Sequence, residues 1–342
     1  MKLKILGFAL LAVCVCAVCC MCGSDSKTPD YEFPDGPDPD PDPQPGDYPA
    51  GLTVTEFADD LGGGKQCLGF VAVADLKANP KLRFNAVHLP QQKIPSRIHA
   101  EFASANRGTA CVTTNAGYWW AGNSLSLLVT GGAVKSIENQ TVTRNNQTVY
   151  PVRSSFGQMA SGGFETHWIY CVLDDGNKPY AFPSALDNDE RTNTYMSAPP
   201  TSKTPGAVLW TPQEAVGGGP MLVKEGKNVA VENYWKEVFD GGGIAGTSRQ
   251  PRTAVGATAD GKLILLVCDG RNMRGSAGFT LAELADKLIE LGAVDAVNLD
   301  GGGSSTMVGS DGKVLNRPSD TGSAEVIVER KISTAVVISE VN

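Results

Sequence analysis

The last third of the chain carries the clearest pattern of apolar and polar positions. Residues 263–268 are aliphatic or cysteine throughout and predict a buried strand. Thr280 and Glu283 have the spacing of a capping box, and leucines at helical spacing follow until Gly292. Residues 294–299 predict a second strand. Strand, helix and strand in this order form a βαβ unit, whose two strands we expect to lie parallel in one sheet.

In the first part of the folded region, strand and helix patterns also follow one another. Residues 68–75 and 82–89 are apolar and rich in β-forming residues, so they predict two strands. Pro95 opens a helical pattern that ends near Gly108. Residues 109–114 then predict a further strand, which leads directly into a polar segment.

Residues 124–227 predict a β-rich meander. Gly131-Gly132 and residues 174–177 have the composition of turns between strands. Residues 184–206 are polar and rich in proline, which predicts a long surface loop. We therefore expect residues 51–342 to form an α+β domain. It would have a mixed β-sheet with a C-terminal βαβ unit, and the β-rich meander would be inserted in the middle.

The N-terminus has the pattern of a secretion signal. Two lysines precede an apolar run at residues 5–22, and polar residues follow it. A cysteine near the end of such a run resembles the acylation site of a bacterial lipoprotein, and Cys20 and Cys22 are the candidates. With 18 residues the run is also just long enough for an uncleaved membrane anchor. Residues 1–22 thus predict an exported protein of the bacterial cell envelope that is attached to the membrane by lipid.

Residues 23–50 predict a disordered tether. The segment from Pro29 to Pro49 contains eight prolines and six aspartates. This composition favours an extended, unfolded spacer of roughly 65 Å at about 3.1 Å per residue. Residues 1–50 carry three lysines against eight acids, so they account for five of the eight net negative charges. The folded part is close to neutral and offers no basic field, so we expect no nucleic-acid partner.

Four cysteines follow the tether, at positions 67, 111, 171 and 268. Outside the cytoplasm they would allow two disulfides with three possible pairings, while their apolar surroundings fit buried thiols equally well. The three histidines are scattered, and no Cys-x-x-Cys pattern occurs in this part. We therefore expect neither a zinc site nor a histidine-driven nucleophile, and no organic cofactor. A divalent metal stays open, since two aspartates would be able to share one.

Asp300 follows a predicted strand and precedes three glycines and three hydroxyl residues. Such a loop allows main-chain N–H groups to approach an anion or a sugar closely, although a plain glycine turn is the alternative. Asp269 ends the other strand of the predicted βαβ unit. Both carboxylates should then lie at the sheet edge where open α/β sheets bind ligands.

Other polar and aromatic residues follow predicted strands in the same way. Arginine forks suit phosphate, carboxamides suit sugar hydroxyls, and Tyr118, Trp119 and Trp120 would offer a stacking face. Structural alternatives exist, since the arginines would also pair with the aspartates and the tryptophans would also fit a core. The predicted catalytic acids are Asp269 and Asp300, and the predicted binding residues are Asn115, Gly218, Gly219, Arg252, Thr253, Arg271, Asn298, Gly301, Gly302, Gly303, Ser304 and Ser305.

Taken in order, these motifs resemble those of the phosphodiester glycosidase family. They are Asn115-Ala116-Gly117-Tyr118, Gly218-Gly219-Pro220, Pro251-Arg252-Thr253-Ala254, Asp269-Gly270-Arg271, Gly278-Phe279-Thr280 and residues 298–305. Ala116 stands where glycine is usual. The resemblance spans about residues 85–340. It implies hydrolysis of a sugar-1-phosphodiester of the N-acetylglucosamine-1-phosphate type, which releases the sugar and leaves the phosphate on the other alcohol.

Leaving-group chemistry assigns roles to these residues. A phosphomonoester leaves more readily than an alkoxide because its second pKa is about 6, so it needs charge stabilisation more than a proton. We expect Arg252 and Arg271 to hold the phosphate, with help from the glycine amides. Asp300 would act as nucleophile or general base, with Asp269 orienting or assisting. The carboxamides and Ser304 would bind sugar hydroxyls or the N-acetyl group.

Other functions fit the same residues. A non-catalytic, surface-tethered glycan-binding lipoprotein would use the hydroxyl-binding groups and the tryptophans, but it would not need two acids beside two arginines. An exopolysaccharide-processing enzyme would cleave another linkage or transfer the sugar instead of hydrolysing it. A phosphatase is a weaker alternative, because the sequence shows neither a nucleophilic Cys or His nor an evident metal cage.

Overall fold

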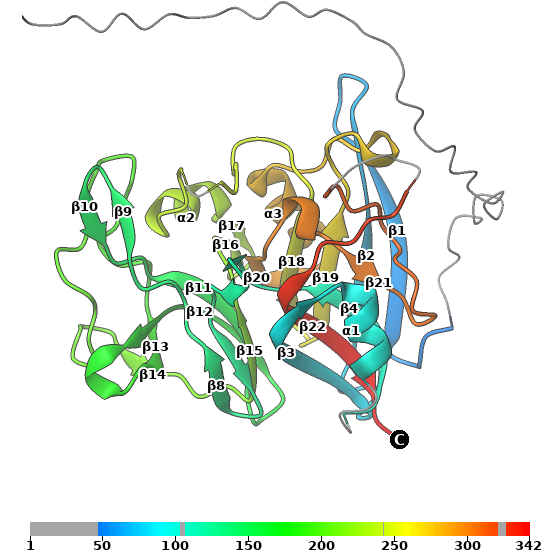
Figure 1. Cartoon of the computed structure of the whole chain (residues 1–342), viewed down its shortest axis with the longest axis horizontal. Coiled ribbons are helices and arrows are strands. Elements are labelled where there is room, and N and C mark those ends of the chain that lie inside the picture. Colours follow the sequence, from blue (N-terminus) through cyan, green and yellow to red (C-terminus); the bar gives the residue numbers. More distant parts are fainter. Residues whose placement is uncertain (1–46, 103–106, 242, 321–325) are drawn as a thin grey trace, which may run out of the picture. The chain divides into compact units, whose positions relative to one another are not determined.

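Strands predominate over helices in this α+β fold, which is built from three larger sheets (Figure 1). The computed structural model describes residues 47–102, 107–241, 243–320 and 326–342. Three α-helices accompany the sheets: α1 (Pro95–Phe102), α2 (Ala230–Lys236) and α3 (Leu281–Glu290). The strong strand and helix patterns of the sequence are confirmed. Most of their boundaries move by a few residues, while α1 is described only to Phe102, before its predicted end near Gly108.

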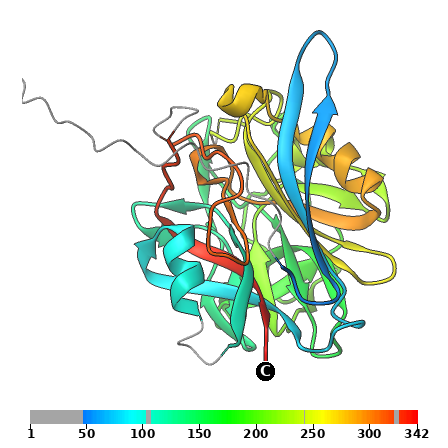
Figure 2. The ribbon, with the colours of Figure 1, turned by 90° about the vertical axis from the view of Figure 1, so that its right-hand side faces the viewer.

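The first sheet has seven strands and includes both strands of the predicted βαβ unit. In spatial order they are β1 (Leu52–Asp60), β2 (Gln66–Ala74), β19 (Leu263–Cys268), β18 (Arg252–Thr258), β20 (Ala293–Asn298), β16 (Met221–Lys224) and β17 (Lys227–Asn228). Figure 2 shows β1 and β2 as a long hairpin at one side of this sheet. All six residues of β19 are buried, as expected for a strand that is covered on both faces.

Strands β19 and β20 run in the same direction, but they are not neighbours. Strand β18 lies between them and pairs antiparallel with each. Every hydrogen-bonded pair of named strands in the described residues is antiparallel, so the mixed sheet of the prediction is replaced by an antiparallel one. The sequence Arg-Thr-Ala-Val-Gly-Ala-Thr of β18 has little β-propensity, which explains why pattern analysis misses this strand.

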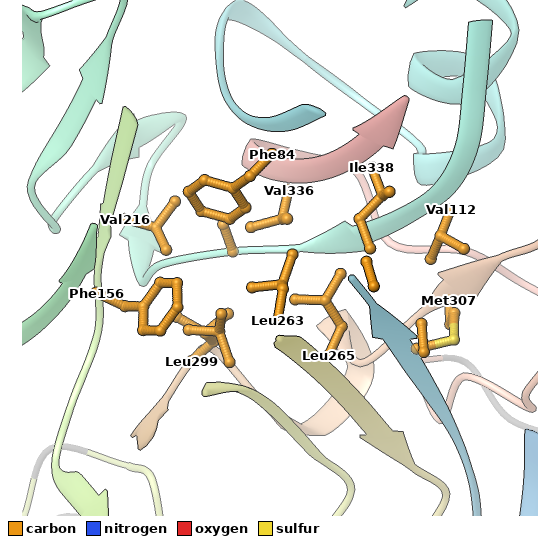
Figure 3. Packing of buried hydrophobic residues seen from close by; sticks show 14 of the residues in the cluster. Phe84, Val112, Phe156, Val216, Leu263, Leu265, Leu299, Met307, Val336 and Ile338 are labelled. Atoms are coloured by element: carbon orange, nitrogen blue, oxygen red, sulfur yellow. The ribbon is translucent and has the colours of Figure 1, made fainter. Parts of the chain in front are cut away.

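The two faces of the first sheet contribute to different hydrophobic clusters. Leu263 and Leu265 of β19 face a cluster that is shared with the other two large sheets, and Figure 3 shows their packing near Phe84 and Phe156. Ile264 and Leu266 face the opposite cluster, where the apolar side of α3 covers the sheet. The alternation follows from the two-residue period of a strand.

Helix α3 begins and packs as its sequence predicts. The Thr280 hydroxyl accepts from the Glu283 amide, and the Glu283 carboxylate accepts from the Thr280 amide, which together form a capping box. Leu284 and Leu288 are fully buried in the cluster against the sheet. The helix thereby fixes the positions of β18 and β20, whose ends form the site described below.

The four-stranded sheet packs on the face of the first sheet opposite α3. Its strands, in spatial order, are β21 (Met307–Val308), β4 (Thr109–Asn115), β22 (Ile332–Glu340) and β3 (Leu82–Lys93). Phe84, Val112, Val336 and Ile338 point from this sheet into the shared core (Figure 3). Strand β4 ends at Asn115 and thus delivers the polar segment that follows it to the edge of this core.

The predicted β-rich middle forms a second seven-stranded sheet. In spatial order its strands are β14 (Val208–Leu209), β13 (Lys178–Phe182), β12 (Phe164–Val172), β11 (Arg153–Gln158), β15 (Glu214–Gly217), β7 (Leu128–Thr130) and β8 (Ala133–Ser136). Two separate hairpins are formed by β5 (Trp119–Trp120) with β6 (Asn123–Ser124), and by β9 (Val142–Arg144) with β10 (Gln147–Val149). Residues 184–206 contain no named strand or helix, in agreement with the predicted loop.

Buried Glu237, just after α2, joins the first and second sheets. Its carboxylate accepts from the main-chain and hydroxyl groups of Ser154 in β11, the Trp168 indole in β12 and the main-chain amide of Met221 in β16. Burial raises the pKa of Glu237 to about 7, although these bonds and nearby Arg153 oppose the shift. The joint lies directly beside the cavity described next, since Arg153 and Phe239 line it.

The predictions on export concern residues that the structure does not describe. The predicted signal segment, both candidate acylation sites and nearly all of the tether lie before residue 47, outside the described residues. In the part of the chain that the structure covers, no helix has the length and apolar character needed to cross a membrane. The four cysteines after the tether are buried and free, which agrees with the buried-thiol alternative.

Candidate active site

A cavity of about 450 Å³ lies beside the ends of β18 and β20 and extends to the second sheet. Among the described residues, its wall contains one carboxylate, that of Asp300. Its arginines are Arg144, Arg153, Arg252, Arg271 and Arg330. Of the residues predicted from the sequence, those that line the cavity are Arg252, Arg271, Asn298, Asp300, Gly301, Gly302 and Gly303. The excess of guanidinium groups over carboxylates favours an anionic ligand.

The position of Asp300 follows from the sheet order. It comes two residues after the last residue of β20, and its main-chain amide donates to the Ala116 carbonyl at 2.9 Å. Burial raises the pKa of the Asp300 carboxyl to about 6, against the opposing effects of the Ser304 hydroxyl, Arg330, the Gly301 amide and the Trp119 indole. A carboxyl group with this pKa is mostly ionised at neutral pH and is still a competent base.

The three glycines after Asp300 leave room for arginine side chains. The Gly301 amide donates to the Asp300 carboxylate, and the Gly302 amide donates to the Pro251 carbonyl, so at most the Gly303 amide stays available to a ligand. A Cβ atom at Gly302 would lie 3.1 Å from the Arg271 guanidinium, and one at Gly303 would lie 2.5 Å from that of Arg330. The expected cradle of free amides is thus largely absent, and close packing of arginines explains the glycines.

Of the two arginines predicted to bind the phosphate, Arg271 is the one whose guanidinium is more available to a ligand. It is exposed, and its Nε donates to the Gln250 side chain at 3.0 Å. It has no ion pair with a carboxylate in the described part of the chain, so most of its guanidinium donors face the cavity without a protein partner. Its backbone has a positive φ of 55°, which is uncommon for a residue other than glycine.

Arg252 is held more tightly than the sequence suggests. It is 2% exposed, and its guanidinium donates to the main-chain carbonyls of Ile244, Ala245, Ser248 and Phe279 at 2.8–3.0 Å. Four donors are consumed in this way, so the side chain chiefly orders the loop at one side of the cavity. Its charge still contributes to the positive field there, because no carboxylate among the described residues pairs with it.

Three further arginines were missed in the sequence. Arg153 of β11 donates to the Glu237 and Val238 carbonyls, and its guanidinium stacks 4.2 Å from the centre of the Phe239 ring. It has no carboxylate ion pair among the described residues. By contrast, Arg144 and Arg330 pair with Glu190 and Asp320, respectively. No local motif distinguishes these arginines from ordinary surface residues, so only the folded arrangement reveals them.

Asn298 lines the cavity with an unpaired acceptor. Its Nδ2 donates to the Tyr118 hydroxyl at 2.8 Å and to the Gly219 carbonyl at 2.9 Å. Its buried Oδ1 has no hydrogen-bond partner within the described residues. Since buried polar atoms are nearly always paired, this oxygen is well suited to accept from a sugar hydroxyl or an acetamido N–H.

Asn115 and Thr253 support the site without lining it. The Asn115 carboxamide donates to the Asp300 main-chain carbonyl and accepts from the Thr253 hydroxyl at 2.8 Å and from the Thr306 amide at 3.2 Å. Asn115 is only 1% exposed. The expectation that it binds a sugar hydroxyl therefore gives way to a positioning role for the loop that carries Asp300.

Asp269 lies apart from the cavity despite its place at the same sheet edge. Its Oδ1 accepts from the Arg317 amide at 2.7 Å and from the Asn316 carboxamide at 3.1 Å, and its side chain is fully buried. Burial raises the pKa of Asp269 to about 6, partly offset by these bonds and by Arg274. The structure thus brings Asp269 to the underside of the Asp300 loop and not into contact with the cavity.

The remaining predicted residues also lie behind the cavity wall. The amides of Gly218 and Gly219 donate to the carbonyls of Ser154 and Asn298, so they hold the two large sheets together. Ser304 and Ser305 are buried completely and do not line the cavity. Of these four residues, only Ser304 influences the pKa of Asp300, which its hydroxyl lowers, although that buried hydroxyl has no hydrogen-bond partner within the described residues.

The three aromatic residues after β4 differ in their exposure and in their contacts. Tyr118 is half-buried, and its hydroxyl donates to the Gly219 carbonyl at 2.7 Å. The Trp119 indole lies beside the Asp300 carboxyl and lowers its pKa. Trp120 also lines the cavity but is largely exposed.

No metal site is evident in the part of the chain that the structure covers. Those residues include no group of three or more His, Cys, Asp or Glu side chains that are placed to hold an ion. Of the two aspartates considered for a shared cation, only Asp300 lines the cavity.

Comparison with known proteins agrees with the motif analysis. The model of the phosphodiester glycosidase family matches residues 131–339. The chain belongs to the phosphodiester glycosidase family. This match includes Asp300, Arg271 and every strand of the second sheet except β7. The cavity is therefore largely a feature of the family domain.

Relatives of this family domain include both characterised and uncharacterised proteins. The N-acetylglucosamine-1-phosphodiester alpha-N-acetylglucosaminidase of Bos taurus is 40% identical over 90 residues, which cover 26% of this chain and 16% of that protein. The SPbeta prophage-derived uncharacterized protein YomE of Bacillus subtilis is 35% identical over 122 residues, covering 35% of this chain and 16% of that protein. The matches thus span less than a fifth of the length of these relatives.

A solved structure shows the same fold. The zebrafish N-acetylglucosamine-1-phosphodiester alpha-N-acetylglucosaminidase catalytic domain, auto-inhibited by its pro-peptide, has a TM-score of 0.57 and 20% sequence identity to this chain. The match covers 85% of this chain and 84% of the zebrafish chain. The phosphodiester glycosidase fold therefore extends over nearly all of the residues described here.

Proposed function

We propose that this protein hydrolyses a sugar-1-phosphodiester of the N-acetylglucosamine-1-phosphate type, releasing the free sugar and leaving a phosphomonoester. The observation that carries the proposal is the composition of the cavity. One carboxylate, Asp300, shares it with five arginines, of which Arg153, Arg252 and Arg271 have no carboxylate partner in the described residues. Family membership supports the same reaction class.

A single carboxylate suits this reaction because of its leaving group. Ordinary glycosidases need a second carboxyl group to protonate an alkoxide as it leaves. A phosphate monoester leaves as a stable anion, so guanidinium groups are sufficient to stabilise the charge that develops on it. Asp269, the second acid expected from the sequence, is then not required to face the substrate.

Different cavity residues bind the phosphate and the sugar. Arg271 holds the phosphate through its free guanidinium donors, and Arg153 adds charge from the second sheet. Asn298 accepts a hydrogen bond from the sugar through its unpaired Oδ1. Asp300 either deprotonates the water that attacks the anomeric carbon or attacks that carbon itself, and in both cases the bond to the phosphate oxygen breaks. The electron pair of that bond stays on the phosphate. If Asp300 attacks, water then hydrolyses the glycosyl ester on Asp300 and releases the sugar.

The proposal is tested with N-acetylglucosamine-1-phospho-6-mannose as substrate. The purified protein should release free N-acetylglucosamine, and the Asp300→Asn variant should release almost none. NMR of the first-formed anomer separates the two roles of Asp300, because a nucleophile retains configuration and a base inverts it. Binding of the sugar phosphate without release would instead favour the non-catalytic glycan-binding lipoprotein. Release with transfer to an added sugar acceptor would favour the exopolysaccharide-processing alternative.

We further propose that the protein is an exported lipoprotein of the bacterial cell envelope. The support is sequence-based: a lysine-led apolar segment ends in Cys20 and Cys22, and a proline- and aspartate-rich tether follows. Labelling cells with a palmitate analogue should mark the protein. Loss of label in Cys20→Ser or Cys22→Ser alone would identify the acylated residue, and label in neither wild type nor variants would contradict the proposal.

A further inference from the structure

Trp120 combines high exposure with a place in the cavity wall. Among the large hydrophobic side chains that are exposed in the described residues, it has the largest accessible fraction, 75%. None of the described aromatic rings stacks on it. An exposed indole leaves a large apolar area in water, so a ligand that covers it gains binding energy.

The backbone that carries Trp120 is well ordered. Strands β5 and β6 pair Trp119 with Ser124 and Trp120 with Asn123. The connecting Ala121 and Gly122 have positive φ angles of 47° and 87°, as in a tight two-residue hairpin turn. The exposed indole is therefore presented by a short, regular hairpin.

Contacts outside the hairpin hold it against the body of the protein. The Ser333 hydroxyl donates to the Gly122 carbonyl at 3.1 Å, which attaches the turn to β22. The Leu125 amide donates to the Tyr118 carbonyl at 2.8 Å and closes the base of the hairpin. Because the hairpin is fixed at both ends, its backbone does not need to be ordered when a ligand binds, and only the Trp120 side chain does.

The neighbouring Trp119 shows where Trp120 lies relative to Asp300. The Trp119 indole lies beside the Asp300 carboxyl, at the point where the sugar–phosphate bond would be cleaved. Trp120 is the next residue, and its high exposure places it at the rim of the same cavity. A ligand that fills the cavity at Asp300 and extends outward would pass over Trp120.

We infer that Trp120 forms an outer subsite that stacks on a sugar ring bearing the alcohol side of the phosphodiester. Flat aromatic faces bind the apolar faces of sugar rings, and no arginine or lysine of the described residues stacks on the Trp120 ring. The inference rests on the proposed function and specifies its substrate class: a phosphodiester whose alcohol is itself a sugar, within an oligosaccharide or polysaccharide. Phosphodiesters of small alcohols would leave this subsite empty.

The test compares two substrates that differ only in the alcohol. They are N-acetylglucosamine-1-phospho-6-mannose and the methyl phosphodiester of N-acetylglucosamine-1-phosphate. We expect Trp120→Ala to lower kcat/KM for the mannose diester about tenfold more than for the methyl diester, mainly through KM. Trp120→Phe should retain part of this preference, since it keeps an aromatic face. Leu173→Ala, which removes an exposed apolar side chain away from the cavity, serves as the matched control and should not change the ratio.

The outcomes separate the subsite from the reaction. An equal loss on both substrates, or no loss on either, would overturn the role of Trp120 while leaving the proposed hydrolysis intact. If the wild type cleaves neither substrate, calorimetry with the mannose diester decides. Binding that Trp120→Ala weakens would support the subsite and reject the hydrolysis, and binding that the variant leaves unchanged would reject the subsite.

Discussion

The Asn115 carboxamide donates a hydrogen bond of 2.6 Å to the main-chain carbonyl of Asp300. The two residues are 185 positions apart, and the bond connects the end of β4 to the loop after β20. Together with the bonds that Asn115 accepts from Thr253 and Thr306, it fixes the loop on which the candidate catalytic carboxylate stands.

Asn115→Asp should therefore reduce activity without a direct contact to substrate. The new carboxylate has no donor for the Asp300 carbonyl and repels it, so the loop shifts. We expect kcat to fall about 100-fold, since displacements near 1 Å have effects of this size. The free energy of unfolding should fall by about 2 kcal/mol. Steady-state kinetics and denaturant unfolding measure the two effects.

Asn188→Asp is the matched control for this variant. Asn188 is also 1% exposed, donates through Nδ2 to the Tyr150 carbonyl and accepts from the Met196 amide, but it lies outside the cavity wall. It should lose similar stability and keep its turnover. Equal losses of kcat in the two variants would show that Asn115 acts only through general stability.

Asp300 should control the acidic side of the pH profile. Its pKa is raised to about 6, and the ionised form is the active one, so kcat/KM should decrease about tenfold per pH unit below pH 6. Asp300→Asn should fold normally and lose at least about 1000-fold in kcat, and its residual rate should lack this acidic limb. A variant that keeps the limb would assign the titration to another group.

Asp269→Asn should have a much smaller effect than Asp300→Asn. The amide oxygen of asparagine is able to accept the same bonds from the Arg317 amide and the Asn316 side chain, and the residue does not line the cavity. We expect kcat within about tenfold of the wild type, which is below the range for a lost general base. A loss as deep as that of Asp300→Asn would restore Asp269 to the reaction itself.

Arg271→Lys should affect charged substrates selectively. Lysine keeps the charge but loses the fork that binds two phosphate oxygens at once. We expect kcat/KM for the phosphodiester to fall about tenfold more than for an uncharged aryl N-acetylglucosaminide. Arg107→Lys, an arginine outside the cavity that pairs with Glu214, is the control. Equal losses on the two substrates would exclude a phosphate contact by Arg271.

Glu237→Gln should destabilise the joint between the two large sheets. Glutamine has only one acceptor oxygen. Its NH₂ group would therefore face a donor group of Ser154, Trp168 or Met221, whose hydrogen bonds the Glu237 carboxylate now accepts. We expect a loss of about 3 kcal/mol in the free energy of unfolding. Exposed Glu232→Gln, on the helix α2 that ends just before Glu237, should change it by less than about 0.5 kcal/mol. Thermal and denaturant unfolding provide the measurement.

Local sequence patterns were sufficient for the elements with strong signals. The all-aliphatic β19 and the capping box of α3 are strong signals, because burial on both faces and an orphan helix N-terminus each require specific residue types. Strand β18 lacks such a signal, and its insertion between β19 and β20 depends on pairing partners far away in the sequence. The parallel direction of β19 and β20 was thus predicted correctly, while their hydrogen-bonded neighbours were not.

The candidate site could be predicted only in part for the same reason. The glycine loop identified the position of Asp300, but residues that end strands at one sheet edge need not share a cavity: Asp300 lines it, whereas Asp269 is buried and does not. Arg153 could not be predicted as a site residue from the sequence, because its role depends on the contact between two sheets. Asn115 was recognised as important, yet only the hydrogen bonds show that it positions the loop.

The cavity draws its carboxylate and part of its positive charge from separate sheets. Asp300 stands after a strand of the first sheet, whereas Arg153 comes from β11 in the second, and Glu237 joins the two. Mutations on the second sheet can therefore alter the charge and shape offered to the leaving group without disturbing the residue that attacks the sugar. This arrangement gives evolution a way to change the preferred phosphodiester while the bond-breaking step stays the same.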